Sequence, residues 1–569
     1  MSPAKQPRFA LGEASETCRK GLPVGKSPLP TGLEGPESEG FARRIPSTPA
    51  DYFRLTAHSE VGPATSFPAR NFRNAGDRGP GRGPCAWLGS PGNGRNGNHI
   101  AHAVPPSGPG FHAQQRTFRP YAIIHPSASS MQPEPNAEIL SGISPDRVAE
   151  SYHSGKLEAL SQAELFRAAA HIVSQPKLDL NSFRLHAPLE IMARYNLLPL
   201  VSTADLDLAR IQIVATASHY QAGGEGVSPP ERIRIARSSD AAANLRRAVQ
   251  EGDVARADAL CLSLAGAGGL QELLDAITDL TLRTLTGAAH THIGLMLMTR
   301  MSSDVGHTAL GLARAGVRSL AQAPGLNLKR VTIHRTLKDP ETELASILRA
   351  VPVVSPQGPG MVAMMQATEQ ADLPDRLLGD ALLSNADEVR CESALRTACR
   401  IAALSMLEDK PEPAKYYWTH CLTLPHAAWA LTRFLPGRSF AAEAAHTAAT
   451  WVMAIRASHG NGNLKPLPEL ERLEMDLTEA RVHSPRAAAS VAWFARQDER
   501  PRIERTIATE AAIRNDAHLV KYAWACLDAA AQDPTHAPLF HAAAAYLCAI
   551  WCIEQPRDGL VRNLGEGRG

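Results

Sequence analysis

The sequence predicts an all-α protein, a multi-helix bundle or array of helix pairs that follows a disordered N-terminal segment. Three observations lead to this prediction. From about residue 135 onward apolar residues recur at helical spacing, and Ala is abundant. The runs of β-branched residues, at 329–334 and 351–354, are too short to indicate a sheet. Before residue 131, neither a helical nor an alternating period persists for more than a few residues.

The composition changes near residue 131. Residues 1–130 hold 15 Lys+Arg against 8 Asp+Glu, and 35 of them are Gly or Pro. More than about a quarter Gly+Pro without a repeat is typical of disordered segments. We therefore expect residues 1–134 to be disordered, with Met131 as a candidate physiological start; the alternative is a genuine disordered tail. The helical domain is expected at 135–556 and a flexible Gly/Arg-rich tail at 557–569.

Several classes of protein are excluded by charge and hydropathy. Residues 131–569 hold 44 Lys+Arg against 49 Asp+Glu, which argues against a nucleic-acid-binding body. No apolar run reaches the roughly 18 residues that span a bilayer, and residues 542–553 fit a buried helix better. The N-terminus lacks the apolar core of a secretory signal. We expect a cytoplasmic protein that binds neither membrane nor nucleic acid.

Local signals place several helices. Ser161 and Glu164 have capping-box spacing ahead of an Ala-rich turn. A helix that opens at Ser202 or Thr203 is apolar on too many sides for a surface position, so we expect it to be buried. Residues 240–264 predict two amphipathic helices that are joined at the Glu-Gly-Asp sequence 251–253.

Histidines supply the first candidate chemistry. Sixteen of the 21 His follow residue 131, and several lie in apolar, helix-like contexts. These are His290 with His292, His420 with His426, and His518 with His541 further on. Imidazole titrates near neutrality and is the commonest metal ligand, so several His converging in an apolar bundle could support acid–base or metal chemistry.

The spacing of these histidines does not predict a metal site. His290 and His292 are two residues apart and point to different sides of a helix. His420 and His426 are six apart, and we expect Pro425 to break the helix between them. Neither pair has the i, i+3 or i, i+4 spacing that puts two ligands on one face. A lone buried His bonded to a backbone carbonyl is the commoner outcome.

The segment from Asn515 contains the most specific pattern. Asn515 or Asp516 is placed to cap a helix on which His518 and Lys521 share one face. Lys521 lies among apolar residues, so it should either snorkel to water or pair with Asp516 or Asp528. In a pocket, His518 and Lys521 would offer a proton donor and an oxyanion stabiliser. The alternative is a capped helix whose polar face meets solvent.

Fingerprints of common redox cofactors are missing from the sequence. The Gly-rich stretches at 221–226 and 265–269 follow helices rather than strands, which does not fit a dinucleotide-binding turn. There is no GxxxxGK[ST] sequence and no CxxCH, and no flavin, haem or dinucleotide-fold motif is found. The nine Cys form no CxxC pair, and 391/399 and 548/552 are expected to be core thiols.

The stretch NDAHLVKYAWACLDAA at 515–530 resembles the D-x-H-x-x-K…A-C-L helix of the questin oxidase-like proteins. WTHCLTLPHAAWALTRFL, with His420, Thr423 and His426, is similar to that family's segment in which a His leads into an H-A-L-type helix. The helix pair around RAVQEGDVARADAL, followed by AAHTHIGLML, resembles its earlier His-bearing part.

The resemblance implies an all-helical oxidoreductase, a monooxygenase that inserts oxygen into an aromatic or polycyclic ketone in a Baeyer–Villiger-type reaction with NADPH. Its substrate would be a small aromatic, polyketide-like molecule. By the same resemblance His518 acts as general acid/base and Lys521 stabilises the developing oxyanion, while His420, His426 and His290 line the pocket.

Two alternatives stay open. The first is a non-catalytic helical scaffold that binds a protein or small molecule, in which the His would be scattered over an exposed concave face. The second is a metalloprotein that uses some of the same His as ligands. An enzyme would instead bring His290, His420, His426 and His518 within a few ångströms of one another around an enclosed cavity.

Overall fold

The prediction of an all-α fold is confirmed by the computed structural model. It describes residues 134–179, 181–282, 285, 289–322, 339–358, 360–378, 388–409, 415–434 and 440–560, and none of these forms a strand. They contain one isolated β-bridge, Lys177 to Gly226. The described residues belong to one compact unit within residues 50–569. The expected disordered segment, apart from Glu134, lies outside the described residues, as do 329–334 and the chain after Leu560.

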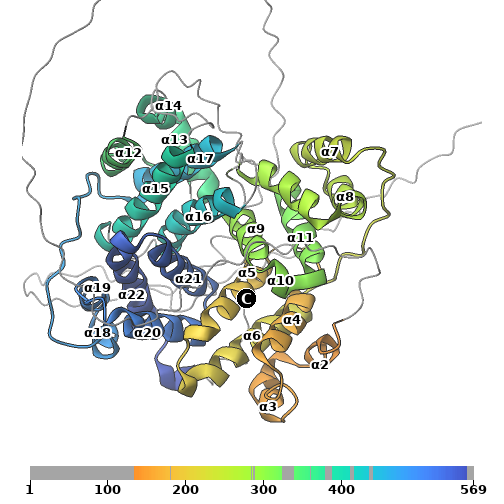
Figure 1. Cartoon of the computed structure of the whole chain (residues 1–569), viewed down its shortest axis with the longest axis horizontal. Helices are drawn as coiled ribbons and strands as arrows, with labels where there is room; N and C mark the ends of the chain where they lie inside the picture. Colours follow the sequence, from red (N-terminus) through yellow and green to blue (C-terminus); the bar gives the residue numbers. More distant parts are fainter. Residues whose placement is uncertain are drawn as a thin grey trace, which may run out of the picture. The chain divides into compact units, whose positions relative to one another are not determined.

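The first helices cover the chain up to residue 222 (Figure 1). They are α2 (Ala137–Ser141), α3 (Val148–His153), α4 (Gln162–Val173), α5 (Ser182–Leu197) and α6 (Leu206–Ala222). The capping box before α4 is confirmed, since Ser161 and Glu164 bond each other's backbone N–H groups. Helix α6 is buried along most of its length, as its apolar sequence predicts.

The predicted helix pair follows next. It consists of α7 (Ser238–Gln250) and α8 (Val254–Leu282), which turn at residues 251–253 and pack against each other. The turn needs Gly252, whose φ of 71° lies in the left-handed region. Gly269, at φ 84°, bends α8. Three further helices, α9 (His290–Arg300), α10 (Ser302–Val305) and α11 (Ala309–Gln322), complete this part.

The middle of the chain forms α12 (Pro340–Arg349), α13 (Met361–Gln370), α14 (Leu373–Leu378), α15 (Glu388–Glu408), α16 (Lys415–Phe434) and α17 (Ala441–His459). The expected break at Pro425 is wrong, because α16 continues through it. Proline costs a helix one hydrogen bond, but α16 is packed by α9, α15, α17 and α21, and this packing outweighs the local penalty. Val351–Val354 is extended without forming a strand, although Val354 N donates to Ala457 O.

The last helices are α18 (Leu477–His483), α19 (Pro485–Trp493), α20 (Arg500–Ile513), α21 (Ala517–Gln532) and α22 (Ala537–Glu554). In the described part of the chain, one helix, Pro534–Glu554, is long and apolar enough to cross a membrane, and its apolar window is 78% buried inside the protein. This agrees with the buried helix expected there. Short 3₁₀ turns lie at Pro145–Arg147, Leu198–Leu200, Thr203–Asp205, Gly306–Thr308, Pro534–His536 and Arg557–Gly559.

The beginning of the expected tail is packed rather than free. Arg557 forms ion pairs with Asp205 and Glu510, and Leu560 is buried. The packed chain therefore extends at least to Leu560, four residues beyond the predicted domain end at 556.

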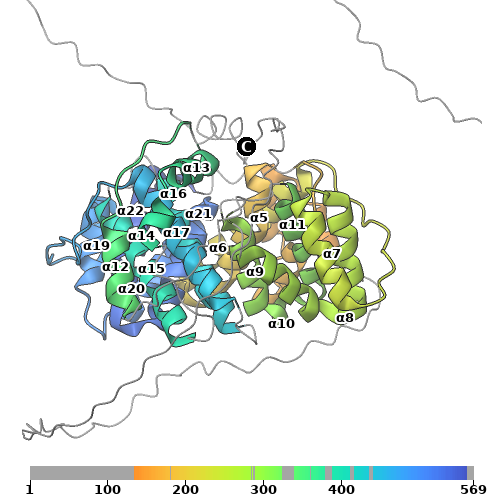
Figure 2. The same cartoon turned by 90° about the horizontal axis from the view of Figure 1, so that it is seen from above.

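Four helices from distant parts of the sequence meet in the interior. Helix α5 packs against α9 and α21, and α16 packs against the same two helices, so the four form a closed ring of contacts. Figures 1 and 2 show them together near the centre of the helical unit. Side chains that point into this ring are surrounded by protein on every side, which makes it the natural place for buried chemistry.

Candidate functional site

One histidine from each of the four central helices lies in this ring. His186 comes from α5, His290 from α9, His420 from α16 and His518 from α21, and all four are buried. We call them the histidine cluster. Their ring centroids lie 4.3 to 6.3 Å from that of His186. The predicted residues His290, His420 and His518 are thus brought together, and His186 joins them.

The ring nitrogens of the histidine cluster converge. His186 Nε2 lies 3.0 Å from the Nε2 atom of His518 and 3.0 Å from that of His290. One ring nitrogen each of His186, His290 and His420 lie within 4.8 Å of one another. Helices α5, α9 and α16 therefore bring three imidazole nitrogens close together, and His518 of α21 joins them through its contact with His186.

The backbone of α5 sets the tautomer of His186. Its Nδ1 lies 2.6 Å from the carbonyl oxygen of Ser182, so Nδ1 carries the proton and donates it there. In the neutral ring this leaves Nε2 with a lone pair that faces both His290 and His518. If hydrogen bonds alone connected these rings, the single Nε2 lone pair of His186 would have to accept from both His290 and His518.

Other nitrogens of the histidine cluster lack partners. The Nδ1 atoms of His290 and His420 are buried and form no hydrogen bond among the described residues. His518 Nδ1 lies 4.0 Å from the Asp516 carboxylate, too far for a hydrogen bond. Buried polar atoms without partners are uncommon in folded proteins, and each calls for an explanation such as a bound ion or water.

Lys521 is the second unsatisfied group. Its side chain is fully buried, and Nζ has no hydrogen-bond partner among the described residues. The expectation that it snorkels or pairs with Asp516 or Asp528 is therefore wrong: the helix is buried on all sides, and Asp528 pairs elsewhere. Burial lowers the pKa of Lys521 to about 7, although the charges of Asp516 and Glu190 oppose the shift.

Burial also keeps the four histidines neutral. Loss of hydration, together with the positive charge of Lys521, lowers the pKa of His186 to about 3. The same two causes hold the pKa values of His420 and His518 well below the ordinary value, as burial and the neighbouring His186 do for His290. Neutral imidazoles offer lone pairs, and they are poor proton donors at neutral pH.

Two carboxylates, those of Asp516 and Glu190, lie near the histidine cluster. Asp516 caps α21 by accepting from Leu519 N at 2.7 Å, which confirms the predicted N-cap, and burial raises its pKa to about 6. Glu190, one turn after His186 on α5, pairs with Arg194 at 2.6 Å. The Tyr416 ring lies 4.5 Å from that of His518. The Tyr416 ring therefore packs directly against the His518 ring, while the two carboxylates contribute negative charge near the cluster.

His426 does not belong to the cluster, which corrects its placement in the same pocket. It lies six residues after His420 on an unbroken helix, about 240° around the axis. Its Nε2 bonds the Asp528 carboxylate at 2.8 Å, and Asp528 also forms an ion pair with Arg300. The Trp524 ring packs against His426 at 5.3 Å. We call this group the His426–Asp528 pair.

Three members of the histidine cluster, His186, His290 and His420, form a candidate site for a single transition-metal ion. Nitrogens that bind one ion at about 2.0–2.1 Å lie about 2.9–3.4 Å apart when adjacent, and the two 3.0 Å separations at His186 fall in this range. An Nδ1–H that donates to a backbone carbonyl, as in His186, is the usual support of a His ligand. An all-imidazole donor set suits iron, copper or zinc.

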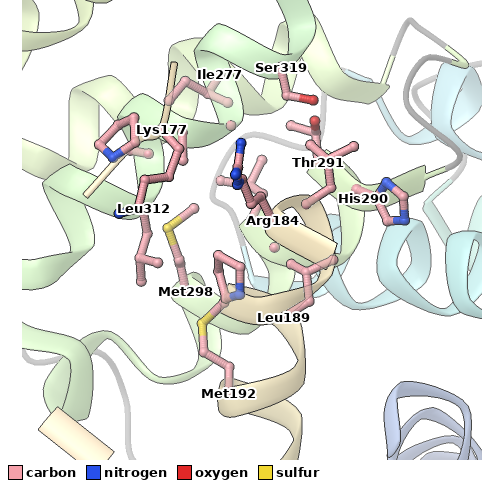
Figure 3. Close-up of a pocket in the computed structure, with 18 of the residues that line it drawn as sticks. Lys177, Arg184, Leu189, Met192, Ile277, His290, Thr291, Met298, Leu312 and Ser319 are labelled. Atoms are coloured by element: carbon pink, nitrogen blue, oxygen red, sulfur yellow. The ribbon is translucent and has the colours of Figure 1, made fainter. Parts of the chain in front are cut away.

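A pocket adjoins the cluster on the side of α5, α9 and α11, and Figure 3 shows it. The space between its lining residues is ≈ 640 Å³ when open solvent is included, and the centres of water-sized molecules can occupy ≈ 60 Å³ of it. Leu189, Met192, Met298 and Leu312 form apolar walls, and His290 is the member of the histidine cluster that lines it. Pockets of this kind, apolar with a few polar groups, are typical of small-molecule sites.

His186 is the functional residue that the sequence analysis missed. It lies in SFRLHAPLEIMARY, where Pro188 follows two residues later and polar residues alternate with apolar ones. The available signal was the i, i+4, i+8 spacing of His186, Glu190 and Arg194, which puts three polar residues on one face of the helix. That face is buried in the structure.

The similarity of this chain to known proteins was also tested. No family model, curated protein or solved structure matches it. The site must therefore be interpreted from its own geometry and from the sequence resemblance described above.

Proposed function

We propose that this protein is an oxidoreductase of the questin oxidase-like type, which inserts oxygen into an aromatic or polycyclic ketone. The observation that carries the proposal is the convergence of His186, His290, His420 and His518 in one buried cluster beside an apolar pocket. A scaffold would have scattered these histidines over an exposed face, so their burial together favours an enzyme.

The histidine cluster would hold one iron or copper ion. Its lone pairs, its neutral state and the unpartnered Nδ1 atoms fit this role, and the carbonyl of Ser182 orients His186 for it. Such an ion would supply the activation of dioxygen that oxygen insertion requires and that no side chain can provide. NADPH, which the resemblance implies, is kept as the proposed electron donor.

The residues around the cluster would act on the substrate. Lys521 points an unpartnered amine into the same buried region, so it can donate a hydrogen bond to a substrate oxygen that gains negative charge. His518 is better suited to donate a lone pair than a proton, because its pKa is held far below neutrality. This places the expected general-acid role on Lys521 rather than on His518.

The test uses the full chain, loaded with Fe(II) or Cu(I) without oxygen and then mixed with 1,8-dihydroxyanthraquinone, dioxygen and NADPH. We expect dioxygen consumption and a product that has gained one oxygen atom, detected by mass spectrometry. His518→Ala should abolish both. His446→Gln is the matched control, since His446 is a largely buried histidine outside the cluster. Full turnover by His518→Ala would remove the assignment.

A further inference from the structure

The pocket beside His290 contains two cations that the proposed chemistry does not use. Lys177 and Arg184 line it together with the apolar side chains of α5, α9 and α11. Figure 3 shows Lys177 and His290 on opposite sides of the pocket, with Arg184 between them. A pocket for a purely apolar ligand would gain nothing from one buried and one half-buried cation, because removing a cation from water costs hydration energy.

Both cations are held in place by the protein. Lys177 is 6% exposed, and its Nζ donates to the carbonyl oxygens of Gly224 at 3.1 Å and Gln221 at 3.4 Å. The guanidinium of Arg184 lies against Gly224, where a Cβ atom would come within 2.6 Å of Nη2. Gly224 also has a φ of +65°, so this position requires glycine on both grounds.

Positive charge exceeds negative charge at this end of the pocket. Arg184 pairs with Asp179 at 2.8 Å, but the Asp179 side chain is 79% exposed, so water weakens the pair. Lys177 forms no ion pair with a carboxylate among the described residues and donates instead to neutral backbone carbonyls. Burial and the charge of Arg184 both lower its pKa. An anion that binds between the two cations would relieve this imbalance.

Much of the remaining pocket wall is apolar. It includes Leu189 and Met192 of α5, Met298 of α9 and Leu312 of α11, and Figure 3 shows Leu312 and Met298 on the same side as Lys177. From Arg184 to Met192 the pocket wall runs along eight residues of α5, about 12 Å. Thioethers make favourable contacts with aromatic rings, and two Met side chains line this part.

Glycines keep the pocket open. A Cβ atom at Gly294 would lie 3.0 Å from Leu189 Cδ2, and one at Gly316 would lie 3.7 Å from Thr291 Cγ2. Both glycines line the pocket. Larger residues at either position would fill space that a flat ring system can occupy.

We propose that this pocket binds an aromatic carboxylate, with its carboxylate held by Lys177 and Arg184 and its ring system lying against Met192 and Met298 toward His290. The inference deepens the proposed function by naming the class of its substrate, and the step at the histidine cluster rests on that proposed function. The binding itself depends only on the pocket, so the two can fail separately.

The test measures binding of two fluorescent probes to the full chain, anthracene-2-carboxylate and its neutral analogue anthracene-2-carboxamide. We expect the carboxylate to bind at least 10-fold more tightly, with a preference that weakens as salt is added. Arg184→Gln and Lys177→Gln should each remove most of this preference and leave carboxamide binding unchanged. Arg147→Gln, which alters an exposed ion pair with Glu150, is the matched control and should change neither.

Gly316→Leu checks the location, because it should weaken both probes equally by filling the pocket. Equal affinity for the two probes, or a carboxylate preference that survives Arg184→Gln and Lys177→Gln, would overturn the proposal. If Gly316→Leu bound both probes as tightly as the wild type, the assignment of the binding site to this pocket would be wrong. Removal of metal with a chelator, or His186→Ala, should leave the carboxylate preference intact, which separates this result from a failure of the metal-dependent function.

Discussion

Helices α16 and α21 carry two buried histidine sites that differ in how their polar atoms are satisfied. At one, His420 and His518 join His186 and His290, and the ring nitrogens meet without a carboxylate or a cation between them. At the other, a few residues along the same helices, His426 bonds Asp528, which also pairs with Arg300.

The two sites differ in whether neighbouring side chains satisfy their buried polar atoms. In the His426–Asp528 pair the carboxylate faces the Arg300 cation and the ring nitrogen of His426, while Nδ1 of His426 forms no hydrogen bond among the described residues. At the histidine cluster, two Nδ1 atoms and the amine of Lys521 are unsatisfied. Buried polar atoms without hydrogen bonds lower the stability of the fold, because they lose their hydration and gain no bond in exchange. What sets the histidine cluster apart is that its unpaired atoms lie beside converging ring nitrogens, which is why we propose a bound ion there.

The largest expected difference between the two sites is catalytic. His186→Ala removes the ring whose Nε2 is shared by two neighbours, so we expect turnover and metal content to fall by more than about 100-fold. His426→Ala should keep metal content within about twofold of the wild type. Metal analysis and dioxygen consumption of both variants measure this, and equal losses in both would erase the distinction between the sites.

The next difference is in stability. Asp528→Asn leaves Arg300, whose side chain is 24% exposed, beside a neutral group and weakens the bond to the buried His426, so we expect a loss of about 1–3 kcal/mol. Urea unfolding, followed by circular dichroism, measures the free energy of unfolding. Metal content should not change. A loss of metal with little loss of stability would show that the His426–Asp528 pair serves the site rather than the fold.

The pH dependence of stability sharpens the same contrast. Burial alone would raise the pKa of Asp528, but its hydrogen bond from His426 and the charge of Arg300 hold it at about 2, below the ordinary 3.8. A lowered carboxyl pKa stabilises the fold above pH 4 by about 2 kcal/mol, and this contribution disappears as the pH falls from about 4 to about 2. Asp528→Asn should lack it. We would measure the urea concentration at half-unfolding of the wild type and of Asp528→Asn at several acidic pH values. The same dependence on pH in both proteins would contradict the account.

The smallest expected effect on stability comes from Lys521→Met. Methionine fills a similar volume without a buried amine, so the free energy of unfolding should stay the same or rise by about 1 kcal/mol. Turnover should nevertheless fall, because the donor to the substrate oxygen is gone. A clear loss of stability in urea unfolding would mean that Lys521 has a structural partner and belongs with the satisfied groups.

Sequence patterns predicted the helices well because their signals are local. The capping box of Ser161 and Glu164, the turn at Gly252 and the cap at Asp516 each depend on residues within a few positions of one another. The error at Pro425 arose from a force that acts at long range, since the packing around α16 keeps the helix continuous.

The site was predicted only in part for the same reason. His290, His420 and His518 stood out through their apolar surroundings, but their meeting point is set by contacts between helices far apart in the sequence. His186 lies 332 positions from His518. The separation of His426 from His420 follows from helical geometry, once the helix is known to be continuous.

The central claim is that the histidine cluster binds a transition-metal ion, and two histidines on α9 test it most directly. His290 belongs to the cluster, while His292, two residues later, is also buried and lies near the backbone of Thr281 rather than near the other cluster histidines. We would measure iron, copper and zinc in the full chain and in His290→Gln and His292→Gln. The account predicts one metal ion per chain in the wild type and in His292→Gln, and loss of it in His290→Gln. A wild-type chain that neither carries nor takes up metal, or equal metal content in all three proteins, would contradict it.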